Sequence, residues 1–115
     1  MIKFWNPWSG KAEKVQFTIS RYFYNDRLAI EMNRWDEEWN YWVPYCKVTV
    51  NIDEEISHAK CGFVDTNNAP FLPDFLIQNG LAEPTGRVGY SGYCMYPEFD
   101  FTKLLATEGL CNVEG

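Results

Sequence analysis

Residues 61–96, CGFVDTNNAPFLPDFLIQNGLAEPTGRVGYSGYCMY, contain the best-marked helix of the chain. Pro70 and Pro73 preset the backbone where the helix begins, and Asp74 places a carboxylate near the positive end of the helix dipole. The apolar residues that follow recur at intervals of three and four. This spacing predicts a helix over residues 72–79 whose apolar face packs on the rest of the protein.

The end of this helix carries an equally clear signal. Gly80 stands where a helix needs a left-handed residue, and Leu81 can contact Leu76 across the last turn, which is the pattern of a Schellman motif. Residues 83–86, Glu-Pro-Thr-Gly, are then expected to form a turn. Residues 87–96 mix tyrosines with two glycines, and we expect an irregular strand there.

Alternation of apolar and polar residues predicts strands elsewhere in the chain. The expected strands cover residues 14–24, 27–35, 43–52 and 60–64. The first two should form an antiparallel hairpin with its turn at Asn25-Asp26. In the third strand, the alternation places Cys46, Val48, Val50 and Ile52 inward and Thr49 outward.

The fold class follows from this order of elements. We predict a single α+β domain, with an antiparallel sheet of four to five strands and one helix packed on it. A chain of 115 residues with 46% hydrophobic residues is large enough to bury its own core. Residues 14–101 should form that core, residues 1–13 an N-terminal arm or edge strand, and residues 102–115 a loosely held segment. The stretch between residues 35 and 42 is expected to be a connecting loop.

The net charge and the absence of targeting patterns in the sequence bear on the binding partners and on the cellular location of the protein. Sixteen acidic against ten basic residues give a net charge of −6 and a pI near 4.7, so direct binding of nucleic acid is disfavoured. The negative charge has two possible interpretations. It either keeps the protein soluble or imitates the phosphate array of DNA. The sequence has neither a signal-peptide pattern nor an apolar run long enough for a membrane span, which predicts a cytoplasmic protein.

Residues with reactive side chains are few and scattered. The four cysteines are widely spaced with no CxxC pair; two disulfides are formally allowed, but reduced, buried thiols are the expectation. His58 is the single histidine and lies in a polar connector. We therefore predict no catalytic residue, no metal site and no cofactor.

Three blocks of the sequence resemble an uncharacterised family of small proteins. These blocks are VDTNN at 64–68, FLIQNGLAEPTGR at 75–87 and GYSGYCMYPEFDF at 89–101. Members of that family, a domain of unknown function, are encoded on conjugative elements, plasmids and prophages of gut bacteria. The resemblance covers residues 15–101 and implies an accessory protein of a mobile element, with no activity that can be transferred. The tryptophan-rich residues 35–42 depart from the shorter turn of the family.

Two hypotheses of function remain. The first is a non-enzymatic protein that binds a protein partner, including an inhibitor of restriction or CRISPR immunity. Its partner patch would consist of Trp35, Glu37, Glu38, Trp39 and Trp42, unless the indoles fold back on the sheet as a lid. The second is a small enzyme or ligand-binding module with a polar pocket around Arg87. That pocket would contain Arg87, Tyr90, Ser91, Tyr93, Asp65, Asn67 and Asn68. The sequence does not predict an oligomeric state.

Overall fold

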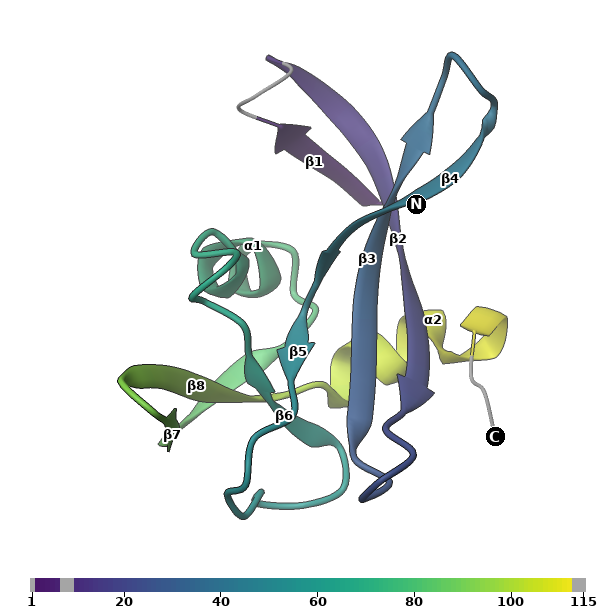
Figure 1. Ribbon diagram of the computed structural model, residues 1–115. Coiled ribbons are helices and arrows are strands. Elements are labelled where there is room, and N and C mark those ends of the chain that lie inside the picture. The colour runs from purple at the N-terminus through teal and green to yellow at the C-terminus, as the bar shows by residue number, and fades with distance from the viewer. Residues whose placement is uncertain (1, 7–9, 113–115) are drawn as a thin grey trace.

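Two antiparallel sheets and two helices form the domain (Figure 1). The predicted α+β class is confirmed, but the strands are divided between two sheets rather than one, and a second helix accompanies the expected one. The computed structural model describes residues 2–6 and 10–112; for residues 2–6, 11 and 108–112 it describes the backbone alone. The helices are α1 (Leu72–Gln78) and α2 (Thr102–Asn112). In the part of the chain that is described, neither helix has the length and apolarity needed to cross a bilayer.

The first sheet has the strand order β1-β2-β3-β4. Its strands are β1 (Ile2–Asn6), β2 (Lys11–Arg21), β3 (Leu28–Asp36) and β4 (Tyr41–Lys47). The β2–β3 hairpin confirms the predicted pairing, with Ile19 directly opposite Ile30. Residues 1–13 were expected to form an arm or an edge strand; of these, residues 2–6 form the edge strand β1 and residues 11–13 begin β2. The stretch between residues 35 and 42 was expected to be a loop; it forms the ends of β3 and β4 and the tight turn between them.

The second sheet has the strand order β5-β6-β8-β7. Its strands are β5 (Thr49–Val50), β6 (Cys61–Val64), β7 (Glu83–Ser91) and β8 (Cys94–Asp100). Two predictions about β7 and β8 were wrong. Residues 83–86 lie inside β7, where Gly86 has a φ of +93° and the register shifts between Pro84 and Val88, so the expected turn is a bulge. Residues 87–96 form a hairpin rather than one strand, and Gly92, with a φ of +62°, lies in its turn.

The chain crosses from the first sheet to the second at Val48. The N–H of Val48 donates to Ile30 of the first sheet, and the Val48 carbonyl accepts from the N–H of Asp65 just beyond β6. The single strand predicted over residues 43–52 is therefore divided into β4 and β5. Thr49, expected to face outward, is buried, and its hydroxyl accepts a hydrogen bond from the Ile30 N–H at 3.0 Å. That bond satisfies a polar group which would otherwise be costly to bury.

The hydrophobic core lies between the sheets and the helices. Its largest fully buried side chains include Phe17, Met32, Leu72, Phe99 and Phe101. Leu104 of α2 is also fully buried, and α2 packs against β2 (Figure 1). Of the segment 102–115 that was expected to be loosely held, residues 102–112 therefore form a packed helix, and the rest lies outside the described residues. A second, smaller cluster of Ile52, Phe63 and Tyr96 is formed by β6, β8 and the residues after β5.

Helix α1 ends as the sequence predicts. Gly80 has a φ of +64°, the Leu81 N–H donates to the Leu76 carbonyl at 2.9 Å, and the Gly80 N–H donates to the Ile77 carbonyl at 3.1 Å. These two bonds define the Schellman motif. Leu76 and Leu81 are both buried in the same core cluster, as the apolar contact of this motif requires. The motif fixes the direction in which the chain leaves α1 toward β7.

We expect Gly80→Ala to lower the free energy of unfolding by about 1–2 kcal/mol, because a Cβ in the left-handed region clashes with its own backbone. Urea denaturation measures this change. Gly80→Asn is the matched control and should cost less, since asparagine tolerates this conformation. An alanine variant as stable as the wild type would contradict the assigned helix stop.

Candidate functional site

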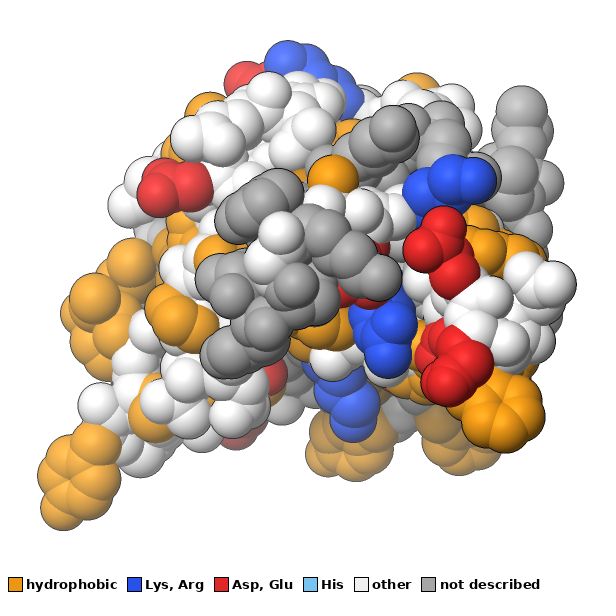
Figure 2. Space-filling view, turned by 90° about the horizontal axis from the view of Figure 1, so that it is seen from above, with side chains coloured by type: hydrophobic (Ala, Val, Ile, Leu, Met, Phe, Trp, Pro, Cys, Tyr) orange, Lys and Arg blue, Asp and Glu red, His pale blue; other side chains and the backbone are white. Residues whose placement is uncertain are grey.

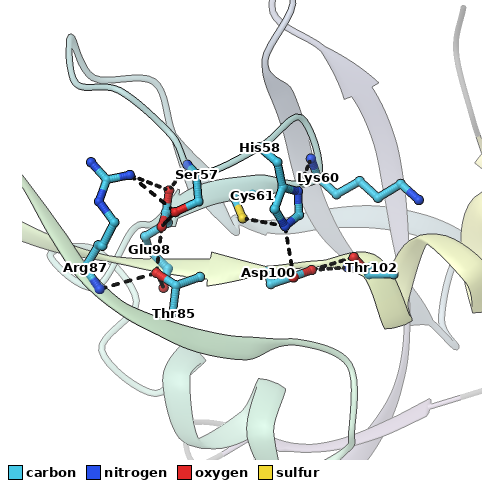
Figure 3. Close-up of polar contacts among 9 residues, drawn as sticks. All are labelled: Ser57, His58, Lys60, Cys61, Thr85, Arg87, Glu98, Asp100 and Thr102. Carbon is cyan, nitrogen blue, oxygen red and sulfur yellow. Dashed lines mark hydrogen bonds and ion pairs between the residues drawn. The ribbon is translucent and has the colours of Figure 1, made fainter.

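The polar residues of the second sheet gather on its outer face, beneath residues 51–60, hereafter the 51–60 loop (Figure 3). Strand pleating places Tyr96, Glu98 and Asp100 of β8 on this face, together with Cys61 and Phe63 of β6. On the opposite face of the same strands, Val64 and Phe99 belong to the main core. The 51–60 loop therefore covers a surface that carries both apolar and ionisable side chains.

Glu98 is the centre of this surface and is fully buried. Its Oε1 accepts hydrogen bonds from the hydroxyls of Ser57, at 2.7 Å, and Thr85, at 2.6 Å. Its Oε2 accepts from the Ser57 N–H at 2.7 Å and pairs with Nη1 of Arg87 at 3.4 Å. Arg87 also donates to Ser57 Oγ at 3.3 Å. Three separate segments of the chain are thus joined at one carboxylate.

These contacts decide the charge state of Glu98. Burial by itself would raise the pKa of this carboxyl, but the hydrogen bonds from Thr85 and Ser57 and the positive charge of Arg87 outweigh it and lower the pKa below the ordinary value of 4.5. Glu98 is therefore a buried anion at neutral pH. Its partners Ser57, Thr85 and Arg87 all belong to the chain itself, so this carboxylate joins the 51–60 loop and β7 to β8.

A second cluster on the same face brings together His58, Cys61 and Asp100 (Figure 3). His58 Nε2 lies 3.1 Å from Asp100 Oδ2 and 3.4 Å from Cys61 Sγ. The other ring nitrogen, Nδ1, accepts from the Lys60 N–H at 3.2 Å. Oδ1 of Asp100 accepts from both the N–H and the hydroxyl of Thr102, at 2.8 and 2.6 Å. These contacts fix the positions of all three side chains.

The cluster does not have the geometry of a cysteine nucleophile. In a Cys–His–Asp triad the thiol and the carboxylate contact different ring nitrogens, whereas here both contact Nε2. Burial raises the pKa of the Cys61 thiol, which disfavours the reactive thiolate. Burial also raises the pKa of Cys46, to about 12, assisted by the charges of Asp65 and Glu31. Neither thiol is activated for attack.

The residues predicted to line a polar pocket do not meet in one place. Arg87 is held by Glu98 and Ser57 on the outer face of the sheet. Asp65 is buried and binds Asn68 through both carboxylate oxygens, at 3.3 and 3.0 Å. Asn67 is exposed beside them, and Ser91 and Tyr93 lie at the far end of the β7–β8 hairpin. Arg87 and Asp65 thus already have internal partners.

The tip of the β7–β8 hairpin instead carries exposed apolar side chains, the hairpin patch of Val88, Tyr90, Tyr93 and Met95. Their exposed fractions are 40%, 59%, 110% and 55%. Tyr90 and Met95 are directly opposite each other, and Val88 lies two residues from Tyr90, so these three share one face of the hairpin. Figure 2 shows hydrophobic side chains gathered at the edge of the molecule toward which this hairpin extends.

The predicted tryptophan patch is divided. Trp35 and Trp42 are opposite each other on β3 and β4, half-buried, with their rings edge to face at a centroid distance of 5.3 Å. Trp39 is exposed in the turn, beside Glu37 and Glu38, and Asp36 accepts hydrogen bonds from the N–H groups of Glu38 and Trp39. The indoles form neither one bare surface nor a lid on the sheet.

A shallow hollow of about 180 Å³ lies on the polar face of the first sheet. It is lined by Thr18, Ser20, Tyr22, Ala29, Ile30, Glu31 and Lys47. Ligand pockets usually enclose roughly 300–1,000 Å³, so this hollow is too small to bury a ligand of ordinary size.

Comparison with family models assigns the chain to a family. A model described as a domain of unknown function, DUF4313, matches residues 16–112. The chain belongs to the DUF4313 family. Searches of curated proteins and of solved structures gave no match. The expected resemblance to a family of unknown function is confirmed, while its link to mobile elements stays a prediction.

Two features of this DUF4313 domain were missed from the sequence. The structural role of Glu98 was not predicted, because Ser57 and Thr85, which bind it, are far from it in the chain. The spacing His58-x-x-Cys61 was visible, and in a turn before a strand it brings two metal-binding side chains together. Asp100 completes the cluster only through the pairing of β6 with β8, since it lies opposite Cys61.

We expect Glu98→Gln to lower the free energy of unfolding at pH 7 by about 1–3 kcal/mol, because hydrogen bonds to a charged acceptor are lost or weakened. The wild-type domain should lose stability as the pH falls below 4.5, since the lowered pKa means that the unfolded chain takes up the proton first. The variant should show a shallower decline. Urea denaturation at several pH values measures both effects.

Glu83→Gln is the matched control. Glu83 forms an exposed ion pair with Lys103 at 2.8 Å, and such surface pairs contribute roughly 0–1 kcal/mol. A Glu98 variant with the same stability and the same acid sensitivity as this control would contradict the role of the buried carboxylate.

Proposed function

We propose that the chain is a non-enzymatic protein-binding domain and that the hairpin patch is its contact surface. The observation that carries this proposal is the exposure of Tyr90, Met95 and Val88 on one hairpin face, with Tyr93 at the tip. Aromatic side chains and methionine are enriched in protein interfaces, where tyrosines often contribute most of the binding energy. A contiguous apolar surface of this kind is unusual on a monomer that has no partner.

The hairpin is held firmly from its other face, which suits a preformed binding surface. Gly89 lies against Ile52 and Phe63, and a Cβ at this position would be 2.7 Å from a carbon of each side chain. The Tyr90 N–H is bound by Glu54 at 3.3 Å, which fixes the outer edge of β7 to the 51–60 loop. Little conformational freedom is lost when such a surface binds, so more of the contact energy becomes affinity.

The surroundings of the hairpin patch indicate the chemistry of the partner. Asp53, Glu54 and Glu55 follow one another in the 51–60 loop, and the contact of Glu54 with Tyr90 places this acidic run beside the β7 edge. Of the cations beside this loop, Arg87 is paired with Glu98, and Arg27 donates to the Ile52 carbonyl at 3.0 Å. A protein surface with an apolar centre and a basic rim is complementary to this arrangement and to the net charge of −6.

The finer form of the proposal is an anti-defence protein of a mobile genetic element in the bacterial cytoplasm. It is supported by the resemblance of three sequence blocks to proteins of conjugative elements, plasmids and prophages, and by the acidic balance of the chain. Nucleases of restriction and CRISPR systems have basic grooves for DNA, and an acidic protein can occupy such a groove.

The alternative, a small enzyme or ligand-binding module around Arg87, has weaker support. The guanidinium of Arg87 is already neutralised by Glu98 and bonded to Ser57. A ligand would have to replace contacts that hold the 51–60 loop in place. We therefore favour protein binding over ligand binding.

The test is a pull-down from lysate of a native bacterial host, with the wild type beside a Tyr90→Ser, Tyr93→Ser variant. A specific partner should be retained by the wild type and lost by the variant, because two interface tyrosines each contribute about 2 kcal/mol or more at a hot spot. The binding constant of the purified partner gives the magnitude, roughly 30-fold weaker for each tyrosine lost.

Phe23→Ser, Tyr24→Ser is the matched control, since these two aromatic residues are comparably exposed at the turn of the β2–β3 hairpin. It should leave binding unchanged. Equal loss in both variants, or no partner at all, would contradict the proposed surface. The anti-defence form is tested separately by phage plating on hosts with restriction or CRISPR immunity, and unchanged plating would overturn it.

A further inference from the structure

We infer that His58, Cys61 and Asp100 bind one divalent transition-metal ion, with Zn²⁺ the best match to their chemistry. One nitrogen, one sulfur and one carboxylate oxygen lie within 4.8 Å of one another. Zinc is bound in proteins by this combination of donors, and sites with three protein ligands keep a fourth position open. The inference is independent of the proposed protein-binding function.

The distances between donor atoms fit a tetrahedral ion. Zinc lies about 2.3 Å from sulfur and about 2.0–2.2 Å from nitrogen or oxygen, so neighbouring donors in a tetrahedron are roughly 3.3–3.6 Å apart. His58 Nε2 lies 3.4 Å from Cys61 Sγ and 3.1 Å from Asp100 Oδ2. These two distances need adjustments of only a few tenths of an ångström, which the exposed side chain of His58 can make. The third pair of donors, Cys61 Sγ and Asp100 Oδ2, lies within 4.8 Å.

The fold holds the three donors before any ion binds. Cys61 and Asp100 are opposite each other on β6 and β8, so strand pairing fixes their separation. The Cys61 N–H donates to the His58 carbonyl at 3.0 Å, which turns His58 toward the same point. Thr102 occupies Oδ1 of Asp100 and leaves Oδ2 facing the cluster. Hydrogen bonds of this kind to a ligating carboxylate orient it for metal binding.

Metal binding changes the position of the His58 ring proton and removes the Cys61 thiol proton. Without metal, the Lys60 N–H points at Nδ1 of His58, which places the ring proton on Nε2. A metal on Nε2 requires the proton to move to Nδ1, so the bond from Lys60 is given up and solvent can replace it, since Lys60 is exposed. The Cys61 thiol loses its proton to become the thiolate ligand. One proton is therefore released for each ion bound.

The bound ion would secure the 51–60 loop. His58 belongs to that loop, while Cys61 and Asp100 belong to the sheet beneath it. The side chains of His58 and Asp100 are 49% and 34% exposed, so the fourth position faces solvent and takes a water molecule or an exogenous ligand. The ion would thus add a second attachment of the loop beside Glu98.

Calorimetric titration of the metal-free full chain with ZnCl₂ tests this inference. We expect one ion per chain and release of one proton, read from the dependence of the heat on the buffer. Co²⁺ should give a thiolate-to-metal charge-transfer band. His58→Gln and Asp100→Asn should each weaken Zn²⁺ binding by more than about 100-fold, the upper end of what loss of an outer-shell contact costs.

Cys94→Ser is the control, because Cys94 is a half-buried free thiol at the other end of β8. It should bind Zn²⁺ like the wild type and keep the cobalt band, whereas Cys61→Ser should lose both. The inference is overturned if the wild type takes up no stoichiometric ion, if His58→Gln and Asp100→Asn bind as tightly as the wild type, or if Cys94→Ser abolishes binding. Thermal unfolding of each variant identifies any that fails to fold; His58 and Asp100 are partly exposed, so their variants decide the question even if Cys61→Ser unfolds.

Discussion

The buried carboxylate of Glu98 connects the 51–60 loop to the second sheet. An ionised carboxylate is expensive to remove from water, and here Ser57, Thr85 and Arg87 together offset that cost. With the loop in place, the apolar cluster around Phe63 is covered and the edge of β7 is fixed. The cluster around His58 and the backing of the hairpin patch both depend on this attachment.

This attachment also decides which residues are available for function. Arg87 has the chemistry of a ligand-binding residue, but its charge compensates Glu98 and its donors help to hold Ser57. The apolar side chains of the hairpin patch have no such internal role, and they extend from a hairpin whose other face is tightly packed at Gly89. This difference between residues with internal partners and residues left exposed is the physical basis of the proposal that the hairpin tip is a protein-binding surface.

Local signals in the sequence predicted the end of α1 and the β2–β3 hairpin correctly, but they gave a turn at residues 83–86 where the structure has a bulge inside β7. The stop of α1 at Gly80 depends on one residue's backbone freedom and one apolar contact, and the β2–β3 hairpin depends on alternation. The crossing at Val48 could not be predicted, because apolar alternation continues through it while the hydrogen-bond partners change sheet. The Glu98 network joins residues as much as 41 positions apart, and nothing near Glu98 marks it as buried. Of the polar clusters beneath the 51–60 loop, the sequence therefore indicated only one pair of residues, His58 and Cys61, through their spacing.

The exchange rate of the Ser57 amide proton tests the central role of Glu98 most directly. This N–H lies in a loop, and its partner is Glu98 Oε2 at 2.7 Å. Measured by NMR in D₂O, it should be protected in the wild type and lose its protection in Glu98→Gln, while the amides of β6 remain protected in both. A Ser57 amide that exchanges at the unprotected rate in the wild type would contradict the account, because the 51–60 loop would then not be held by this carboxylate.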